Sequence, residues 1–361
     1  MKAGAYVPFW SVISPVLCWV LWAGMAFGLH GSLYASVLSI ALIAGVVSAV
    51  HHAEVIAQRV GEPYGTLVLA FAVTMIEVAL IVSLMMSGGP AATALARDTV
   101  FASIMIILNG VVGLCLLLGG RRFGEQSFGL PGVSASLATL AAIAALTLVL
   151  PNYTTTVPGP YYSSSQLGFV AGVSLILYAT FIFVQTVRHR DYFLPTDAAS
   201  DGAAHAEPPD NRISVISAAL LVVCLVAVVF IAESLAPTIE SSVHALNAPK
   251  ALVAIVISSV VLMPEGYAAI RAARRNLLQT SLNLTLGSAL ASIGFTIPTV
   301  ALFSIYFGWR LTLGLETKET ILLLLSLFVA SLSLNTGRTT ILQGVVHLVI
   351  FAVYLLMVVV P

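Results

Sequence analysis

Charged side chains are scarce in this sequence. Its 361 residues include 15 Lys and Arg and 15 Asp and Glu, so 8% of the chain is charged, against about 25% in ordinary soluble domains. So few charges cannot cover the surface of a soluble protein of this length, in which 59% of the residues are hydrophobic. The composition excludes a disordered chain, a nucleic-acid-binding protein and a secreted disulfide scaffold. It predicts a polytopic protein that lies in the lipid bilayer.

Cysteine, histidine and enzyme motifs are also few. The three cysteines, Cys18, Cys115 and Cys224, lie in apolar runs without disulfide or metal spacing, which favours buried free thiols. Seven histidines include one adjacent pair, His51 and His52, whereas a membrane di-iron oxygenase needs several such boxes. The sequence has neither a Gly-x-Ser-Gly element nor an Asp-rich diphosphate motif. We therefore expect no enzyme and no bound cofactor.

Long apolar runs are abundant, and a membrane helix needs roughly 20 such residues. Eleven runs meet this requirement: 7–29, 32–56, 64–87, 99–120, 132–150, 166–187, 213–235, 250–270, 278–307, 320–335 and 340–360. The ninth contains Gly287, Gly294 and Pro298, which predict a tilt or kink. The polar stretch 188–212, which is rich in Ala, Asp and Pro, predicts a flexible cytoplasmic linker. The alternative is that this segment senses cations or pH.

The basic residues indicate the orientation, because cytoplasmic loops carry an excess of Lys and Arg. With the N-terminus in the cytoplasm, eleven basic residues fall inside: Lys2, Arg59, Arg121, Arg122, Arg188, Arg190, Arg212, Arg271, Arg274, Arg275 and Arg338. Four fall outside: Arg97, Lys250, Arg310 and Lys318. This split predicts eleven spans, with the N-terminus inside and the C-terminus outside.

An internal repeat relates residues 53–77 to residues 239–265. Each segment has a glutamate, a proline nine residues later that opens an apolar helix, and one lone glutamate within that helix. These positions are Glu54, Pro63 and Glu77 in the first segment and Glu240, Pro249 and Glu265 in the second. The two helices are the third and the eighth, so they cross the membrane in opposite directions.

The predicted fold class is therefore an all-α polytopic membrane protein with about eleven transmembrane helices. It consists of one extra N-terminal helix followed by two inverted five-helix repeats. The expected divisions are residues 1–30 for the extra helix, 31–187 for the first repeat, 188–212 for the linker and 213–361 for the second repeat.

Glu77 and Glu265 are the principal candidate site residues. Placing a carboxylate at mid-membrane costs about 2.5–3.5 kcal/mol on insertion scales, so its presence there indicates a function. A carboxyl group removed from water can hold a proton near neutral pH and exchange it for a cation. Two such groups, meeting near the midplane, would neutralise one divalent cation or bind two protons. The alternative is a protonated glutamate or an ion pair that joins helices, which Arg271 makes relevant for Glu265.

Oxygen ligands are the main donors near these glutamates. Pro264 removes one helical hydrogen bond beside Glu265, and the carbonyl that it frees suits Ca²⁺ or alkali ions. Further candidate ligands are Thr74, Ser258, Asn283, Ser288 and Asn109, with close helix packing as the alternative reading for these small polar side chains. Glu54, Glu233 and Glu240 lie near predicted helix ends, where they are either solvated or form access funnels for cations.

At these residues the sequence resembles the cation/Ca²⁺ exchanger superfamily, and within it the bacterial calcium/proton and sodium-potassium/proton antiporters. The stretches that carry the resemblance are "HHAEVIAQRVGEPYGTLVLAFAVTMIEVALIVSLM", "GGRRFGEQSF", "ESLAPTIESSVHALNAPKALVAIVISSVVLMPEGYAAIRAA" and "LQTSLNLTLGSALASIGFTIPTVAL". The resemblance implies eleven helices, an inverted repeat, alternating access in a bacterial inner membrane, and one essential glutamate in each repeat, Glu77 and Glu265.

The sequence departs from the family beside both glutamates. The family's usual Gly-Asn-Ala reads Val73-Thr74-Met75 in the first repeat and Val261-Leu262-Met263 in the second, and Gly266 replaces a frequent histidine. The expected partners are therefore inorganic cations and protons, with Ca²⁺, Na⁺ and K⁺ all candidates for exchange. A Na⁺-coupled calcium exchanger without proton coupling is the alternative.

Overall fold

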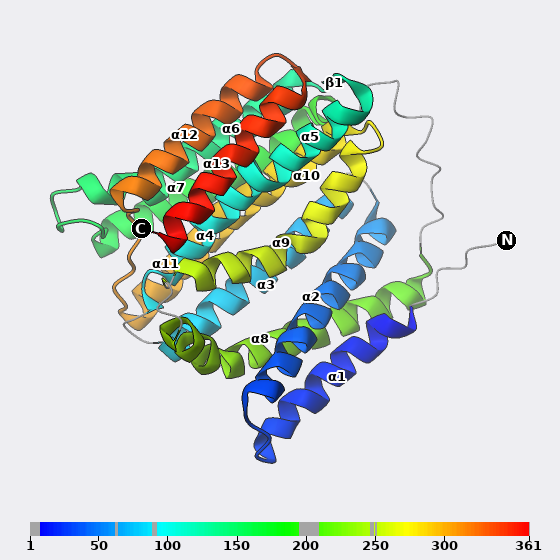
Figure 1. Cartoon of the computed structure of the whole chain (residues 1–361), viewed down its shortest axis with the longest axis vertical. Helices are drawn as coiled ribbons and strands as arrows, with labels where there is room; N and C mark the ends of the chain where they lie inside the picture. The colour runs from blue at the N-terminus through cyan, green and yellow to red at the C-terminus, as the bar shows by residue number, and fades with distance from the viewer. Residues whose placement is uncertain are drawn as a thin grey trace. The chain divides into compact units, whose positions relative to one another are not determined.

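The computed structural model describes residues 8–61, 64–88, 92–194, 209–245, 249 and 251–360 (Figure 1). Its α-helices are α1 (Phe9–Ala26), α2 (Ser32–Val60), α3 (Tyr64–Gly88), α4 (Leu95–Met105), α5 (Val112–Phe123), α6 (Leu130–Ala144), α7 (Ser164–Phe183), α8 (Asn211–Ala245), α9 (Ala251–Ala273), α10 (Leu278–Ala291), α11 (Ile297–Phe307), α12 (Thr317–Leu334) and α13 (Ile341–Val359). The described part has two short strands, β1 (Gln126–Ser127) and β2 (Arg338–Thr339).

Two pairs of these helices form continuous rods through π-helical turns. Ile106–Val111 (η2) joins α4 to α5, and Ser292–Thr296 (η8) joins α10 to α11. Counting each joined pair as one, the thirteen α-helices of the described residues make eleven rods, which confirms the predicted number. Shorter turns continue other helices: Ala145–Val149 (η3) and Leu150–Tyr153 (η4) follow α6, and Val184–Arg188 (η5) and Arg190–Tyr192 (η6) follow α7.

The two joined rods are the third helices of the two predicted halves. A π-helical turn is a common feature of functional sites in helices. The kink predicted for the ninth span takes the form of η8, which ends two residues before Pro298. The third helix of each predicted half therefore contains a π-helical turn.

The rods group into two compact units. Unit 1 comprises Met1–Ala92 and His205–Val253, with α1, α2, α3 and α8, and unit 2 comprises Thr93–Ala204 and Ala254–Pro361, with the other helices. Of α9, all but its first three residues belong to unit 2. Each unit takes helices from both halves of the chain, so the compact units and the predicted repeats divide the chain differently.

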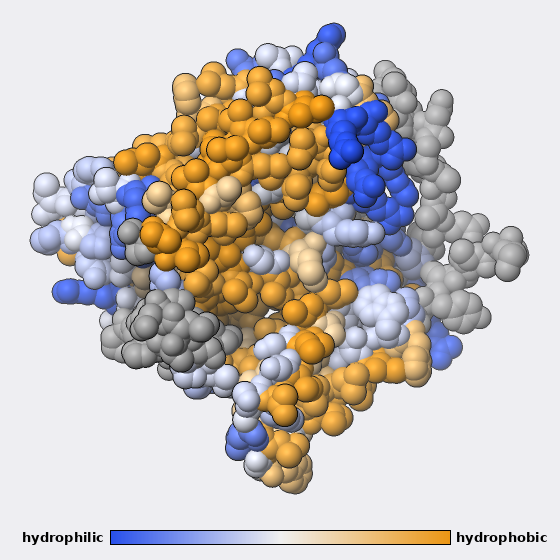
Figure 2. All heavy atoms as spheres, in the orientation of Figure 1, coloured by the Kyte–Doolittle hydropathy of each residue, from blue (hydrophilic) through white to orange (hydrophobic). Residues whose placement is uncertain are grey.

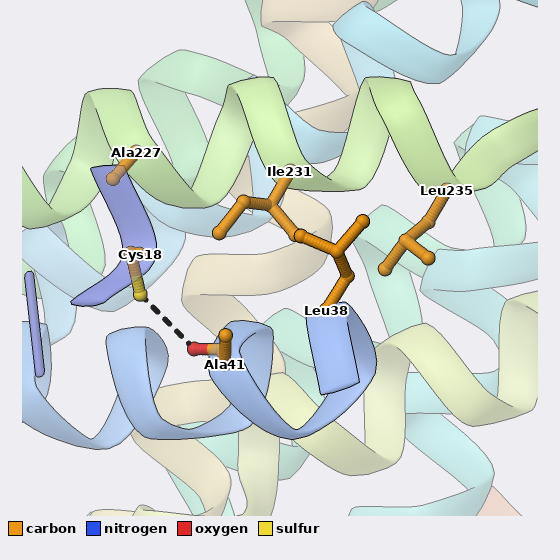
Figure 3. Close-up of a cluster of buried hydrophobic side chains, with 6 residues drawn as sticks. All are labelled: Cys18, Leu38, Ala41, Ala227, Ile231 and Leu235. Carbon is orange, nitrogen blue, oxygen red and sulfur yellow. Dashed lines mark hydrogen bonds between the residues drawn. The ribbon is translucent and has the colours of Figure 1, made fainter. Parts of the chain in front are cut away.

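Unit 1 is built around α2, which packs against α1, α3 and α8. Six buried side chains fill the contact between α1, α2 and α8 (Figure 3): Cys18, Leu38, Ala41, Ala227, Ile231 and Leu235. The Cys18 thiol donates a hydrogen bond to the Ala41 carbonyl over 3.1 Å. Trp22 stacks on Phe230 with 4.9 Å between ring centroids. All three cysteines are buried and free, as predicted.

One end of unit 2 gathers loops that the charge pattern places on the same side. Strands β1 and β2 pair antiparallel, which joins the segment after α5 to the segment before α13. The Gln126 side chain donates to the Ala273 carbonyl over 3.0 Å and to Asn276 Oδ1 over 2.9 Å, so the end of α9 lies here as well. All three segments are cytoplasmic in the predicted orientation.

The opposite end of unit 2 gathers the other loops. Within residues 312–315, backbone N–H groups donate to the carbonyls of Thr93, Leu148 and Pro160 over 3.2, 2.9 and 3.0 Å. These contacts join the start of α4, the end of α6 and the segment between α11 and α12. The predicted alternation of spans therefore holds throughout this unit.

The outer surface of the helices is apolar. In the described residues, nine helices are long and apolar enough to cross a membrane, and Phe9–Met25 and Ala70–Met86 are shorter apolar helices. Figure 2 shows a continuous hydrophobic face over α12 and α13, where Ile321, Phe328 and Leu342 are exposed. Such a surface is stable in lipid rather than in water. The chain is a multi-pass membrane protein.

The predicted end of the seventh run, 213–235, differs from the structure. Helix α8 continues through Pro237 to Ala245, ten residues beyond the predicted end, because a proline is tolerated within a membrane helix when its neighbours compensate. Of the predicted linker, residues 195–208 lie outside the described part of the chain.

Candidate functional site

Glu265 is buried in the middle of α9, with 6% of its surface exposed. The Ser288 hydroxyl, on α10, donates a hydrogen bond to Glu265 Oε2. A hydroxyl that donates to a carboxylate stabilises the charged form of that carboxylate. The structure thus brings together two residues that are 23 positions apart and that the sequence selected separately.

The residues directly before and after Glu265, Pro264 and Gly266, both change the properties of the helix backbone beside the carboxylate. Pro264 has no N–H, so the Val260 carbonyl lacks its usual helical donor. Gly266 faces Val111 of η2, since a Cβ at this position would lie 3.4 Å from Val111 Cγ2, an ordinary packing distance. Helix α9 therefore packs against a neighbouring helix next to its carboxylate.

Tyr178 on α7 is a further neighbour of Glu265. Its phenol interacts electrostatically with the carboxylate, and its ring packs so tightly on Gly294 that a Cβ there would lie 2.8 Å from Tyr178 Cβ. Sequence reasoning missed Tyr178. The available signal was a phenol in the middle of an otherwise apolar span, a polar group that needs a partner in lipid.

One face of α10, next to Ser288, is only partly covered by the described residues; we call it the open strip. Thr280 is exposed, Asn283 and Gly287 are half-buried, and Ala291 is buried. A Cβ added at Gly287 would meet nothing within 4 Å. Most other residues of α10 are buried. This strip, Thr280–Asn283–Gly287, leads to the turn that carries Ser288.

Asn283 and Ser258 use their side chains to join elements. The Asn283 amide donates to the Phe193 carbonyl, and its oxygen accepts a hydrogen bond of 2.8 Å from Gln279. The Ser258 hydroxyl donates to the Thr99 carbonyl over 2.9 Å and ties α9 to α4. In this structure both predicted ligands hold helices in place.

Asn109 lies in η2 but its side chain points to α12 and α13. It donates to Ser326 Oγ over 2.8 Å, and its oxygen lies 3.3 Å from Nδ1 of His347. Neither partner was selected from the sequence. A lone histidine in the last apolar run was the signal for this network.

Glu77 is buried in α3 of unit 1, with 3% of its surface exposed. It is the one charged residue between positions 64 and 88, and Val73, Ile76 and Val78 around it are buried. The Thr74 hydroxyl donates to the Ala70 carbonyl of its own helix over 2.8 Å. The lone carboxyl group predicted for this helix is therefore buried, with buried apolar residues beside it along the helix.

The structure describes the side chains of two of the three predicted access residues. Glu54 on α2 and Glu233 on α8 are both exposed. Glu240 lies in the last part of α8, and its side chain is outside what the structure describes.

A charged cluster in unit 2 was not predicted. Arg97 and Asp98, at the start of α4, form an ion pair of 2.6 Å, and both side chains are largely buried. Arg97 also donates to the Gly314 carbonyl over 2.9 Å. Glu319, in the first turn of α12, interacts with both charges. With Glu316, which interacts with both Asp98 and Glu319, three acidic groups and one arginine therefore meet at the end of unit 2 opposite β1 and β2.

The donor set of the site is oxygen. Among the described residues no group of three or more His, Cys, Asp and Glu side chains is arranged to hold a metal ion. Around Glu265 the available ligands are carboxylate, hydroxyl and carbonyl oxygens, which suit alkali and alkaline-earth cations better than transition metals. Such ions would be transported substrates rather than resident cofactors.

These features define a class: a multi-pass helical membrane protein with lone carboxylates buried inside apolar spans, as in secondary transporters. The chain belongs to the sodium/calcium exchanger protein family, whose sequence profile matches residues 30–187 and 216–360. This match confirms the family that the sequence resembles, and the family is one of transporters.

Two bacterial relatives align along almost the whole chain. The y4hA protein of Sinorhizobium fredii, whose name proposes an ionic transporter, is 51% identical over 99% of this chain and 98% of its own length. The sodium-potassium/proton antiporter ChaA of Escherichia coli is 36% identical over 96% of this chain and 95% of its own length.

Solved structures show the same fold. The crystal structure of the H⁺/Ca²⁺ exchanger CAX matches with a TM-score of 0.72 at 15% identity, over 96% of this chain and 88% of that one. The structure of native YfkE matches with a TM-score of 0.71 at 17% identity, over 97% of this chain and all of that one.

Proposed function

We propose that this chain is a secondary active antiporter that exchanges cytoplasmic Ca²⁺, Na⁺ or K⁺ for external protons by alternating access. The observation that carries the proposal is the buried Glu265 carboxylate, which Ser288 contacts, within a membrane span. The similarity to a sodium-potassium/proton antiporter over nearly the whole chain supports it. The bacterial relatives support a location in a bacterial inner membrane, and the charge distribution supports a cytoplasmic N-terminus.

The exchange chemistry follows from competition for the same oxygens. A deprotonated Glu265 binds a cation, and a proton that arrives from the other side displaces it and neutralises the carboxyl group. A neutral carboxyl group is cheaper to keep in a low-dielectric interior than a charged one, so the empty site returns in protonated form. Cation and proton thus cannot occupy the carboxylate together, which makes the exchange obligatory.

Glu77 takes the equivalent role in the other repeat. It is a lone buried carboxyl group within an apolar helix, as Glu265 is. We assign each glutamate a share of the exchanged charge, so that the loss of either one stops the cycle. Ser288 and the carbonyl freed by Pro264 complete the ligands on α9 and α10. The open strip Thr280–Asn283–Gly287 gives cations a route along α10.

Everted membrane vesicles test this function. Respiration acidifies their lumen, and Ca²⁺, Na⁺ or K⁺ added outside, at the former cytoplasmic face, should release those protons through the wild-type protein. Proton release that depends on Ca²⁺ in Na⁺-free medium would exclude a Na⁺-coupled calcium exchanger. If no cation releases protons at any pH between 6 and 9, the proposal is wrong.

The matched control is another glutamate. Glu125 lies in the segment between α5 and β1, is exposed, and forms a surface ion pair of 3.2 Å with Arg338. Glu125→Gln should exchange as the wild type does, because surface ion pairs contribute little. Glu77→Gln and Glu265→Gln should be inactive at the same membrane content.

A further inference from the structure

A buried chain of hydrogen bonds joins three rods of unit 2 at η2. Asn109 of η2, Ser326 of α12 and His347 of α13 are all fully buried. Asn109 Nδ2 lies 2.8 Å from Ser326 Oγ, and Asn109 Oδ1 lies 3.3 Å from His347 Nδ1. Three polar side chains inside membrane spans are costly unless they are paired.

The hydrogen bonds of this buried network all run in one direction, from donor to acceptor. Ser326 donates its hydrogen to the Leu322 carbonyl over 2.7 Å, so its oxygen accepts from the Asn109 amide nitrogen. The amide oxygen of Asn109 then faces His347, and the imidazole must donate from Nδ1. Nε2 of His347 is buried and has no hydrogen-bond partner among the described residues. A single donor atom of His347 thus orients Asn109.

Close packing holds His347 against this turn. A Cβ at Gly113 of α5 would lie 3.0 Å from His347 Cβ, and a Cβ at Gly344 of α13 would lie 2.5 Å from the Leu117 nitrogen. The imidazole also interacts with the backbone of Leu108, inside η2. Helix α13 therefore packs its backbone against α5, directly after the π-helical turn, and contacts the turn itself through the His347 side chain.

The other face of the same turn reaches the exchange site. Val111, two residues after Asn109, packs against Gly266, the neighbour of Glu265. At the far end of this rod, Thr99 of α4 accepts the hydrogen bond from Ser258 of α9. The shape of the α4–η2–α5 rod therefore sets where α9 holds its carboxylate.

We propose that His347 is a positioning residue for cation exchange: through Asn109 and Ser326 it fixes η2 in the shape that seats Val111 beside Glu265. This inference rests on the proposed function. It assigns Asn109 a supporting role in place of direct contact with the cation. Partners that orient a ligand from outside the binding site typically contribute 10–100-fold in affinity or activity.

Two substitutions at one position test this role. His347→Asn keeps a side-chain N–H near the place of Nδ1, whereas His347→Leu keeps volume and removes the donor. His347→Leu should raise the half-saturating cation concentration roughly tenfold and change the pH profile of exchange, with the maximal rate less affected. His347→Asn should restore both values toward the wild type. Ser326→Ala, which removes the next link, should change them in the same direction as His347→Leu.

The assay is vesicle proton release, with membrane content and thermal stability measured for each variant. Equal half-saturation in the wild type, His347→Leu and Ser326→Ala would overturn the inference. Equal defects in His347→Leu and His347→Asn would overturn it as well, because a role in packing alone does not depend on the donor. If His347→Leu does not fold, the comparison of Ser326→Ala with the wild type decides. Failure of the proposed function is distinct, since the wild type itself would then release no protons.

Discussion

Ser288 is the side chain that most directly adjusts the competition between cation and proton at Glu265. Its hydroxyl donates to the carboxylate, and a hydrogen bond to a charged group contributes about 1.5–3 kcal/mol. Without it protons compete more effectively for the carboxylate. Ser288→Ala should therefore move half-maximal exchange to higher pH by about one unit.

The measurement is vesicle exchange rate against pH at a fixed cation concentration. Ser281→Ala, which removes another buried hydroxyl from α10, is the control and should keep the wild-type profile. A Ser288→Ala profile that stays in place, or that moves to lower pH, would contradict the role given to this hydrogen bond.

At the residue scale the sequence predicts the charges better than their partners. Glu77 and Glu265 stand out because a lone carboxyl group in an apolar run has few explanations. Ser288 follows from helical spacing, and the structure shows its hydroxyl donating a hydrogen bond to Glu265. Asn109 and Asn283 are also candidate ligands by sequence, but an amide side chain in a membrane span can equally well form a hydrogen bond that joins two helices. Which of the two it is depends on long-range partners, His347 and Phe193, that no spacing rule indicates.

At the element scale, α13 packs closely against α5 through its glycine Gly344. A Cβ at Gly344 would meet backbone atoms, the Leu117 nitrogen at 2.5 Å and the Gly113 oxygen at 2.9 Å. Backbone cannot move aside as a flexible side chain can, so Gly344→Ala should destabilise the protein by roughly 1–3 kcal/mol. The measurement is thermal unfolding of the purified protein in detergent.

Gly172 on α7 is the matched control for this prediction. It is exposed, and a Cβ there would meet nothing within 4 Å. Gly172→Ala should unfold at or slightly above the wild-type temperature, because alanine favours helix. Equal unfolding temperatures for the two variants would show that α13 and α5 are not in this contact.

A third glycine tests the open strip of α10. Since a Cβ at Gly287 would meet nothing within 4 Å, Gly287→Ala should exchange at the wild-type rate. Gly287→Leu should fill the strip and lose most of the exchange rate, while unfolding at the wild-type temperature. Exchange at the wild-type rate in Gly287→Leu would exclude this strip as the route to Ser288.

Helix positions were well predicted because each span is a long apolar run with polar ends. The ninth run, 278–307, coincides with the α10–η8–α11 rod. The π-helical turns were not predicted, although Gly294 and Pro298 marked the irregular region. A π-helical turn adds one residue without changing composition, so hydropathy carries no signal for it.

At the scale of the whole molecule, the basic residues are distributed unequally between the two ends of unit 2. Eight belong to segments at the end with β1 and β2: Arg121, Arg122, Arg188, Arg190, Arg271, Arg274, Arg275 and Arg338. Three belong to segments at the other end: Arg97, Arg310 and Lys318. The positive-inside rule then predicts that the end with β1 and β2 is cytoplasmic.

Single-cysteine labelling tests this orientation, and the buried native cysteines simplify it. Ser127→Cys and Thr155→Cys each place a thiol at an exposed position, in β1 and after η4 respectively. A membrane-impermeant maleimide should label Cys at position 127 in everted vesicles only and Cys at position 155 in intact cells. The reverse pattern would show that the N-terminus is outside.

The internal repeat is visible in the sequence because a glutamate and a proline recur nine residues apart, each pair followed by one lone glutamate within a helix. The grouping of α1, α2, α3 and α8 apart from the other helices is not. Contacts between rods depend on which faces are small, such as Gly45 against Cys18 and Val228 in unit 1. In lipid every face of a span is apolar, so the sequence pattern that marks a buried face in soluble helices is weak.

The most direct test of the account is proton movement through the purified protein in proteoliposomes that contain a pH-sensitive dye. For the wild type, an outward or inward gradient of Ca²⁺, Na⁺ or K⁺ should drive protons in the opposite direction. Glu77→Gln and Glu265→Gln should each abolish this movement, while Glu125→Gln should retain it. Cation-driven proton movement that persists in both Glu77→Gln and Glu265→Gln would contradict the central claim, that these two buried carboxylates carry the exchange.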